Sequence, residues 1–325
     1  MWLALLSACR IELGPPEGTV GAATDVPSGE VWVYTSMYQS VIDAFDPLIR
    51  ERLPDVEVRW FQAGSEKVAQ RVEAEWEAGG SPACLLMTSD PFWYARLDAE
   101  GRLAPYLAPN VLQIDRALVD PEGAWVTSRL SLMVLAVNEG IADTPRRFAD
   151  LRDPRWKDQV TSPDPLASGT AFTWLAFLLR DEGWPLVEGL EDNGLVAAGG
   201  NSAVLTRVQT RERPVGVVLL ENLLAAGDQA ARPVYPEDGA VLVPGPIALT
   251  ADCRNPTAAR AIYDLVLSPE GQQLIVAGNM YAALPSIPPP KGAAALDTIP
   301  VRAWTPGWVE QVTAEQASIK ERWTR

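Results

Sequence analysis

Histidine is absent from this sequence, and cysteine and positive charge are scarce. The 325 residues include no His and only three Cys, with no Cys-x-x-Cys pair. These absences exclude Ser–His–Asp and Cys–His nucleophile sites, zinc sites built on imidazole, and cysteine-rich zinc or iron–sulfur sites. Lys and Arg number 27 against 42 Asp and Glu, which gives a formal net charge of −15. Such a surface repels phosphate backbones, so we expect no nucleic-acid partner.

Long hydrophobic runs are also missing. Hydrophobic residues make up 47% of the chain and charged residues 21%, values typical of a soluble globular protein, and the length is sufficient for two domains. An enzyme built on carboxylates, lysine or tyrosine remains possible. Without histidine, however, the composition favours a binding protein, and nothing in it requires a cofactor.

The N-terminus predicts export and a lipid anchor. Leu6-Ser-Ala-Cys9 fits the bacterial lipobox, in which small residues precede a cysteine that becomes lipidated. Residues 10–29 are rich in Gly and Pro without apolar periodicity, which is typical of a flexible tether. We therefore expect a periplasmic or cell-surface protein that is anchored to the membrane at Cys9. The alternative is a chance apolar N-terminus with a buried cysteine.

Strand and helix patterns alternate through the first hundred residues. Short β-rich runs at 31–34, 56–61 and 84–87 are each followed by a helical pattern, and the third run ends at Thr88-Ser89-Asp90. Three βα units in succession predict a parallel, doubly wound α/β sheet that binds ligands at the carboxyl ends of its strands. The pairing of Cys84 and Cys253 is left open by the sequence.

Strand and helix patterns also alternate in the second half of the chain, around a long strand candidate at 129–138. Ser168-Gly169-Thr170 and Asn201-Ser202 each precede an apolar helix, and the buried run 215–220 ends at Glu221. No internal repeat is present.

The order of these segments resembles a known family. In sequence they are Val33-Tyr-Thr-Ser36, Gly64-Ser65, Thr88-Ser-Asp90, Asp153-Pro-Arg-Trp-Lys157, Ser168-Gly-Thr-Ala171, Gly199-Gly-Asn-Ser202, Pro236-Glu-Asp-Gly239 and Ser268-Pro-Glu-Gly-Gln272. The chain resembles the extracellular solute-binding proteins of ABC importers, in the ferric-iron and 2-aminoethylphosphonate branch, over about residues 30–325. The resemblance implies a monomer that delivers a small-molecule solute to a membrane permease.

The resemblance also implies a type II periplasmic-binding fold. In that fold, two α/β lobes are joined by two crossing strands and close over the ligand. The crossings are expected near residues 128–138 and 244–250. Lobe 1 would then be discontinuous, comprising residues 30–128 and 248–325, with lobe 2 at 129–247 and a signal remnant and tether at 1–29.

Short hydroxyl and amide side chains occur at several predicted helix N-termini. Backbone N–H groups there lack intrahelical partners and carry partial positive charge, so they bind anions, and Gly169 would let an oxyanion approach the backbone closely. The alternative is that Ser65, Ser168 and Asn201 are ordinary N-caps. In the family resembled, the positions that match Ser168, Gly169, Thr170 and Asn201 help to bind an anion. The candidate set is Thr35, Ser36, Ser65, Ser168, Gly169, Thr170, Asn201 and Ser202.

Arg129, Glu221 and Tyr281 complete the predicted ligand-binding set with Ser89 and Asp90. Arg129 begins the long strand, where a guanidinium could bind a carboxylate or phosphonate, although a structural ion pair would explain it equally well. Glu221 is placed opposite the anion site, where it would suit a zwitterion carrying an amine; the alternative is a solvated strand-end acid or a helix cap. Tyr281 is expected to line the cleft, as a tyrosine often does in this turn of the family.

The chain departs from the iron-binding members of that family. Those proteins usually carry adjacent tyrosines where this chain has Glu221-Asn222, and a histidine where it has Tyr38. Tyr38, Asp90 and Glu221 could still form an oxygen set for ferric iron. Loss of the tyrosine pair beside a retained anion site nevertheless favours an anionic or zwitterionic solute of the phosphonate or phosphate type.

Two further functions compete with the solute receptor. One is a glycosidase-like hydrolase that uses two of Asp90, Glu221 and Glu237 as acid and nucleophile. Against this hypothesis, no phosphate-binding P-loop, G-x-S-x-G or dinucleotide glycine pattern occurs. The other is a receptor-like scaffold that has no ligand and contacts only a membrane partner.

Overall fold

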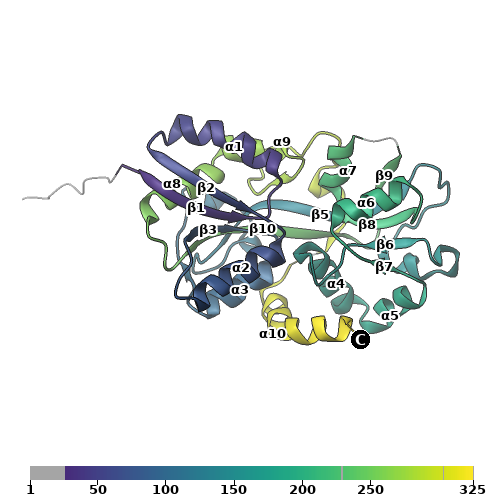
Figure 1. The fold of residues 1–325 in the computed structure, drawn as a ribbon. Helices are drawn as coiled ribbons and strands as arrows, with labels where there is room; N and C mark the ends of the chain where they lie inside the picture. The colour runs from purple at the N-terminus through teal and green to yellow at the C-terminus, as the bar shows by residue number, and fades with distance from the viewer. Residues whose placement is uncertain (1–25, 228–229, 303, 325) are drawn as a thin grey trace, which may run out of the picture.

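The first hundred residues form the predicted βα units. The computed structural model describes residues 26–227, 230–302 and 304–324. The N-terminal elements are β1 (Gly29–Thr35), α1 (Gln39–Arg52), β2 (Val56–Gln62), α2 (Ser65–Glu77), β3 (Ala83–Met87) and α3 (Pro91–Ala99). β1 pairs in parallel with both β2 and β3. All three carboxyl ends therefore meet at one edge of the sheet, toward the middle of the molecule (Figure 1).

Two long antiparallel strands cross the middle of the sheet. They are β5 (Val126–Asn138) and β10 (Ala240–Thr250), in the strand order β2-β1-β3-β10-β5-β8-β6-β7. β10 pairs with β3 through residues 247–249, and β5 pairs with β8 through residues 133–137. All thirteen residues of β5 are buried, which explains its nearly continuous apolar sequence. The two predicted crossing strands are thus confirmed as the strands that join the two halves of the sheet.

The second half of the sheet has helices on both sides (Figure 1). Its strands β8 and β6 pair in parallel, and α4 buries ten of its thirteen residues. The elements are β6 (Val160–Ser162), α4 (Gly169–Asp181), α5 (Trp184–Asp192), β7 (Val196–Ala197), α6 (Asn201–Gln209), β8 (Val215–Leu219), α7 (Leu220–Ala226) and β9 (Ala231–Val234). Short 3₁₀ helices cover Phe148–Arg152 and Pro154–Trp156.

After β10 the chain returns to the first half and then crosses the sheet again. Helices α8 (Pro256–Val266) and α9 (Pro269–Ala277) pack beside α1 and β3. β11 (Tyr281–Ala282) pairs with β5, β12 (Val301–Arg302) pairs with β10 at Ala240 and Val241, and α10 (Pro306–Trp323) follows. β4 (Leu103–Ala104) and 3₁₀ turns at Val111–Gln113, Arg116–Leu118 and Leu296–Thr298 complete the described elements. The lobe boundaries remain a prediction.

The predicted lipid anchor and most of its tether cannot be compared with the structure. Cys9 and most of the predicted tether lie outside the described residues. Among the described residues, no helix combines the length and the apolar character needed to cross a membrane.

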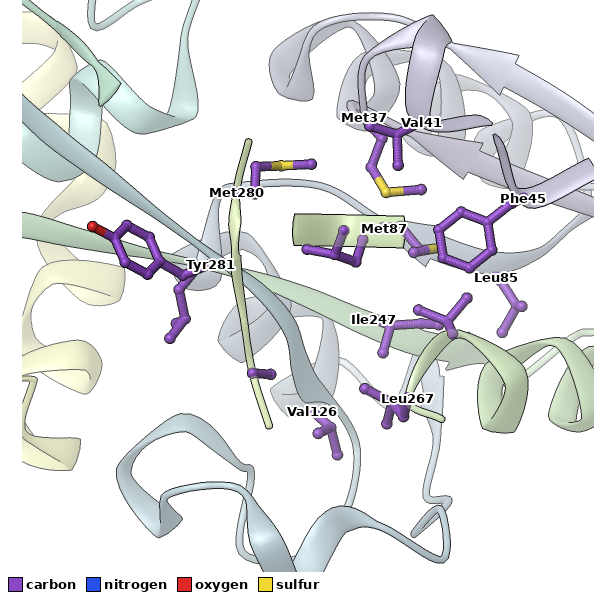
Figure 2. Close-up of a cluster of buried hydrophobic side chains, with 14 of the residues drawn as sticks. Met37, Val41, Phe45, Leu85, Met87, Val126, Ile247, Leu267, Met280 and Tyr281 are labelled. Carbon is purple, nitrogen blue, oxygen red and sulfur yellow. The ribbon is translucent and has the colours of Figure 1, made fainter. Parts of the chain in front are cut away.

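The core of the first half lies between the sheet and helices α1, α8 and α9. Figure 2 shows Phe45 of α1 beside Leu85 of β3 and Ile247 of β10, with Leu267 below them. The i, i+4 spacing of Val41, Phe45 and Ile49 places these side chains on one buried face of α1. Cys84 and Cys253, whose pairing the sequence leaves open, form a disulfide that links β3 to the residues after β10.

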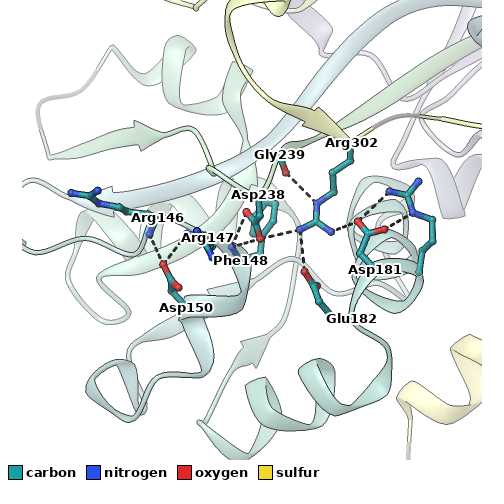
Figure 3. Close-up of polar contacts among 10 residues, drawn as sticks. Arg146, Arg147, Phe148, Asp150, Asp181, Glu182, Asp238, Gly239 and Arg302 are labelled. Atoms are coloured by element: carbon teal, nitrogen blue, oxygen red, sulfur yellow. Dashed lines mark hydrogen bonds and ion pairs between the residues drawn. The ribbon is translucent and has the colours of Figure 1, made fainter.

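Arg302 attaches the C-terminal segment to the second half of the sheet (Figure 3). Its guanidinium forms ion pairs with Asp181 at 2.5 Å, Asp238 at 3.0 Å and Glu182 at 3.6 Å. Its Nε donates to the carbonyl oxygen of Gly239 at 3.2 Å. Every nitrogen of this buried guanidinium therefore has a partner within the protein.

Candidate functional site

A cavity of about 190 Å³ lies between the two halves of the sheet, next to the crossing strand β5. Residues from both halves line it, because the carboxyl ends of the strands in both halves converge there. The structure brings together these predicted residues: Ser36, Ser65, Ser89, Arg129, Ser168, Gly169, Thr170, Asn201, Ser202 and Glu221. The residues proposed from separate sequence motifs thus share one site.

Three helices begin at the cavity. α2 begins at Ser65, α4 at Gly169 and α6 at Asn201, and all three residues line the cavity wall. The first N–H groups of each helix have no intrahelical acceptor and carry partial positive charge. Three such ends around one cavity make it favourable for an anion.

The N-cap interpretation holds for Ser168 only. The Ser168 hydroxyl accepts from the N–H of Ala171 at 3.4 Å. Gly64 and Gly200 are the N-caps of α2 and α6, so Ser65 and Asn201 occupy the first helical position, and their side chains make other contacts.

Ser65 and Asn201 fix neighbouring parts of the site instead of capping helices. The Ser65 hydroxyl accepts from the N–H of Ser89 at 3.2 Å. The Asn201 side chain accepts from the N–H of Leu219 at 3.1 Å and donates to the Thr170 hydroxyl at 3.2 Å. The hydroxyl and amide groups are therefore held in place by contacts within each half of the sheet.

Arg129 is the cation of the site. It is 2% exposed, and its Nη2 donates to the hydroxyls of Ser89 at 3.0 Å and Ser36 at 3.3 Å. Its Nη1 is buried without a hydrogen-bond partner, and in the described part of the chain no carboxylate forms an ion pair with it. Burial lowers the pKa of this guanidinium, which nevertheless stays protonated in proteins. The predicted structural ion pair is therefore wrong, and a buried positive charge faces the cavity.

Glu221 is the carboxylate of the site. Burial raises its pKa to about 7, although a hydrogen bond from the Ser131 hydroxyl at 2.6 Å acts in the opposite direction. The solvated strand-end interpretation is wrong, because the residue is 3% exposed. Near neutral pH this group exchanges readily between a carboxylate that accepts hydrogen bonds and a carboxyl group that also donates one.

Tyr38 lies at the N-terminus of α1 and reaches across the cavity. Its hydroxyl donates to the Asn222 side chain at 2.9 Å, and burial, together with the nearby Glu221, raises the pKa of the phenol. Tyr38 is therefore a neutral hydrogen-bonding group.

Three predicted site residues do not line the cavity. Thr35 donates to the carbonyl oxygen of Met87 at 2.9 Å and accepts from the N–H of Met37, so its hydroxyl is used in joining β1 to β3. Asp90 is the N-cap of α3, where it accepts from the N–H of Trp93. Tyr281 donates to the carbonyl oxygen of Ala294 at 2.7 Å, away from the cavity.

The positions of the acidic residues also test the iron site and the glycosidase site that were considered from the sequence. Because Asp90 caps α3, the proposed iron set with Tyr38 and Glu221 is not assembled. Across the described ranges, no group of three His, Cys, Asp or Glu residues is arranged to hold a metal ion. Glu237 is exposed and pairs with Arg146, so neither Asp90 nor Glu237 lines the cavity with Glu221 as the glycosidase hypothesis requires.

Gly169 also has a packing role that the sequence did not suggest. A Cβ atom there would lie 2.9 Å from both the Cβ of Asp90 and the carbonyl oxygen of Ser89. The absent side chain thus allows α4 to pack against the loop after β3, a contact between protein segments. Gly169 also lines the cavity, and close approach of an oxyanion to its backbone stays a prediction.

Sequence reasoning missed Ser131, Asn222 and Met280, which also line the cavity. Ser131 lies two residues after Arg129 on β5, and residues two apart in a strand share a face, so this period could have identified it. Asn222 directly follows Glu221. Met280 comes from the turn before β11, and no local pattern marks it.

Comparison with solved structures identifies the fold. Iron-bound HitA from Pseudomonas aeruginosa has a TM-score of 0.81 and 18% identity, covering 90% of this chain and 98% of its own. The periplasmic binding protein AfuA from Actinobacillus pleuropneumoniae, with fructose-6-phosphate bound, has a TM-score of 0.79 and 21% identity, covering 91% and 97%. An ABC-transporter substrate-binding protein from Agrobacterium tumefaciens has a TM-score of 0.81 at 17% identity, with 92% and 94% covered. The predicted type II periplasmic-binding fold is confirmed.

Sequence comparisons identify the family. An uncharacterized protein of Haemophilus influenzae is 27% identical over 264 residues, which cover 76% of this chain and 75% of the relative. The model of the family described as bacterial extracellular solute-binding proteins matches residues 83–306, which include most of the cavity. Members of this family are described as solute-binding proteins. The chain belongs to the bacterial extracellular solute-binding proteins.

Proposed function

We propose that this protein is the receptor of an ABC importer for a small solute that carries a phosphate or phosphonate group. The observation that carries the proposal is Arg129, which lines the cavity and whose buried Nη1 has no hydrogen-bond partner. A buried charged donor that lacks an acceptor is unfavourable, so it indicates a missing anion. An oxyanion in the cavity would supply that acceptor.

The surroundings of Arg129 support an oxyanion with several acceptor atoms. The hydroxyls of Ser36, Ser89 and Ser168 and the N-termini of α2, α4 and α6 supply donors from several directions. The net charge of −15 does not oppose this binding, because charges farther than about 10 Å are screened in ordinary salt. The local donors therefore determine the sign of the ligand.

The size of the cavity and the presence of Glu221 in its wall support a ligand whose remaining part, beyond the phosphate or phosphonate group, is small and polar. A volume of about 190 Å³ is below the roughly 300–1,000 Å³ of sites for drug-sized ligands. Glu221 can accept hydrogen bonds from a hydroxyl or an amine, which suits a sugar phosphate or an aminophosphonate. The fructose-6-phosphate bound in AfuA agrees with this ligand class. The iron of HitA is not part of this proposal, because Asp90 caps α3 and does not join Tyr38 and Glu221 at the cavity.

Thermal unfolding and calorimetry with four ligands test the proposal. We expect fructose 6-phosphate or 2-aminoethylphosphonate to raise the melting temperature by mass action, and ferric citrate to have no effect. Arg129→Met should abolish the shift, whereas Arg155→Met, an exposed arginine outside the cavity, should retain it. Inorganic phosphate serves as the fourth ligand and isolates the anion's contribution. Stabilisation by ferric citrate alone would overturn the proposal.

We also propose that the receptor is exported, anchored through a lipid at Cys9, and monomeric when it meets its permease. The lipobox Leu6-Ser-Ala-Cys9 and the following Gly/Pro-rich residues support the anchor. Cys9→Ser should move the protein from the detergent phase to the aqueous phase after expression with its signal. A Cys9→Ser protein that stays equally membrane-bound would contradict the anchor.

A further inference from the structure

Three serine hydroxyls of the first half line the cavity, and each already accepts a hydrogen bond from the protein. Nη2 of Arg129 donates to the hydroxyl oxygens of Ser89 at 3.0 Å and Ser36 at 3.3 Å. The N–H of Ser89 donates to the hydroxyl oxygen of Ser65 at 3.2 Å. A hydroxyl group also has one hydrogen to donate. Because no protein atom among the described residues accepts these three hydrogens, they are available to a ligand.

In the second half, Asn201 sets the direction of a similar set of hydrogen bonds. Its Oδ1 accepts from the N–H of Leu219 at 3.1 Å, which orients the amide so that Nδ2 donates to the Thr170 hydroxyl oxygen at 3.2 Å. The hydroxyls of Thr170 and Ser168 are 3.0 Å apart, and Ser168 also accepts from the N–H of Ala171. One hydrogen lies between the two hydroxyls, and the other has no acceptor among the described residues. The pair therefore offers one more donor to the cavity.

Donors outnumber acceptors in the cavity wall. The four available hydroxyl hydrogens add to the guanidinium of Arg129, whose buried Nη1 has no partner, and to the N-termini of α2, α4 and α6. Among the described residues that line the cavity, Glu221 is the one carboxylate, and one of its oxygens accepts from Ser131. The amide oxygens of Asn201 and Asn222 also accept from protein donors. The wall beside Arg129 therefore consists mainly of donors.

The number of protons on a phosphoryl group decides how well it fits such a wall. The dianion of a phosphate monoester has three terminal oxygens that only accept hydrogen bonds. Its monoanion carries a P–O–H hydrogen, which would face a donor, and it brings one negative charge less to Arg129. A donor that faces another donor loses its hydrogen bond, and an unpaired buried polar group is unfavourable. The monoanion should therefore bind more weakly than the dianion.

We propose that the cavity selects a fully deprotonated oxyanion, so that a phosphate monoester binds as its dianion and a sulfate monoester is accepted in its place. A sulfate ester has the same tetrahedral arrangement of three terminal oxygens and carries no proton near neutral pH. It satisfies the same donors, with one negative charge instead of two. This inference rests on the proposed function, because it concerns the ionisation of the phosphoryl group assigned to Arg129.

Pairs of phosphorus and sulfur ligands, measured by calorimetry on the full chain, test the proposal. Fructose 6-phosphate is compared with fructose 6-sulfate, and 2-aminoethylphosphonate with 2-aminoethylsulfonate, at about pH 8 and about pH 5. The second pKa of a phosphate ester is about 6, so its dianion fraction falls about tenfold between these pH values, whereas the charge of a sulfate ester does not change. We expect both members of a pair to bind at pH 8, the phosphorus ligand more tightly. At pH 5 the ratio of the two affinities should shift against the phosphate by about tenfold, and the aminoethyl pair should shift in the same direction.

The sulfur ligand of each pair reports the titration of the protein itself. The titratable groups that line the cavity are Tyr38, Arg129 and Glu221, and Asp90 lies directly behind the wall at Gly169. Tyr38 stays neutral and Arg129 stays protonated over this range. Burial raises the pKa of Glu221 to about 7 and that of Asp90 to about 6, so these two groups change charge. A variant is therefore needed to separate the proton of Glu221 from that of the ligand.

Glu221→Gln removes the titrating group from the cavity wall. Whatever its effect on each affinity, the shift of the ratio should persist, because the proton belongs to the ligand. Glu237→Gln, at an exposed acid outside the cavity, is the matched control and should give the ratios of the parent.

Three results would overturn this inference and leave the proposed function intact. They are a ratio that is the same at both pH values, a shift that disappears in Glu221→Gln, and binding of the phosphorus ligands without their sulfur counterparts. Failure of both phosphorus ligands to bind at pH 8 would overturn the proposed function, and this inference with it.

Discussion

Two buried arginines of this protein have opposite environments. Arg302 is surrounded by Asp181, Glu182 and Asp238, which together carry more negative charge than it can neutralise. Among the described residues, the guanidinium of Arg129 donates to the hydroxyls of Ser36 and Ser89, and one of its nitrogens has no hydrogen-bond partner. The comparison shows that burial of an arginine does not by itself indicate its role.

The difference lies in where each charge is neutralised. The ion pairs of Arg302 offset the loss of hydration within the fold, so the side chain contributes to the attachment of the C-terminal segment. For Arg129 the protein supplies two hydroxyl acceptors and the charge of Glu221 nearby without an ion pair, so we infer that an external anion completes its neutralisation. The fully paired Arg302 is a structural group, and we infer that the incompletely paired Arg129, next to a cavity, is a binding group.

The largest effect is expected from Arg302→Met. Removal of this cation leaves the carboxylates of Asp238 (17% exposed), Asp181 and Glu182 (both 30% exposed) near one another, and breaking ion pairs to a buried charge typically costs about 3–5 kcal/mol. The free energy of unfolding, measured by denaturant titration, should fall by that amount. A variant as stable as the parent would show that the ion pairs of Arg302 make no net contribution.

Arg129→Met should have the opposite effect: it should weaken ligand binding without lowering the free energy of unfolding. Loss of a buried charge–anion contact typically costs about 2–5 kcal/mol of binding, so the affinity for a phosphoryl ligand should fall at least about 30-fold. The free energy of unfolding without ligand should stay the same or rise, because an uncompensated buried charge is removed while an apolar stem still covers Gly245. Calorimetry and denaturant titration of the same samples check both parts. Large destabilisation with unchanged affinity would make Arg129 structural.

Glu221→Gln should make stability less dependent on pH. Because burial raises the pKa of Glu221 from 4.5 to about 7, the folded state holds a proton that the unfolded state releases between these values. The parent therefore loses stability as pH rises from about 4.5 to 7, by at most about 3 kcal/mol. The variant should match the parent near pH 4.5 and exceed it at pH 8.

Asp90 also lowers stability as pH rises, because burial raises its pKa to about 6. This contribution is present in both the parent and the Glu221→Gln variant. The difference between the unfolding free energies of the variant and the parent thus isolates Glu221. A constant difference from pH 4.5 to 8 would contradict the raised pKa.

The smallest effect is expected from Arg155→Met. Arg155 pairs with Asp143 at 2.7 Å, but these side chains are 45% and 81% exposed. Exposed pairs of this kind contribute about 0–1 kcal/mol, so the unfolding free energy should change by less than that. A loss as large as that of Arg302→Met would remove the distinction between exposed and buried arginines.

Local sequence patterns predicted the elements of the fold well. The apolar spacing of Val41, Phe45 and Ile49 predicted α1, and the alternation of residues 56–61 predicted β2, because burial of one face requires these periods. The crossing strands and the fold type came from the resemblance to a family, since the pairing of β10 with both β3 and β5 joins residues far apart in the chain.

The candidate site was predicted less completely. Ser36 and Glu221 were found because they lie at strand or helix ends, where ligand groups collect in α/β sheets. Arg129 was found because the long strand was expected to begin there, although β5 begins three residues earlier, at Val126. Thr35 and Asp90 lie at equivalent points in the sequence, yet their oxygens are used by neighbouring backbone N–H groups. Which oxygen faces a cavity depends on the direction of each side chain, and a sequence pattern does not specify that direction.

By itself the sequence determined the chemistry that was available: no imidazole, few thiols, an acidic surface and hydroxyls at helix N-termini. These follow from composition and local spacing, because they require no knowledge of distant neighbours. Only the tertiary structure decided that Arg302 is neutralised and Arg129 is not, that Cys84 pairs with Cys253, and that Asn201 donates to Thr170. Each of these depends on contacts between residues far apart in the chain, and such contacts arise only when the hydrophobic core brings the elements together.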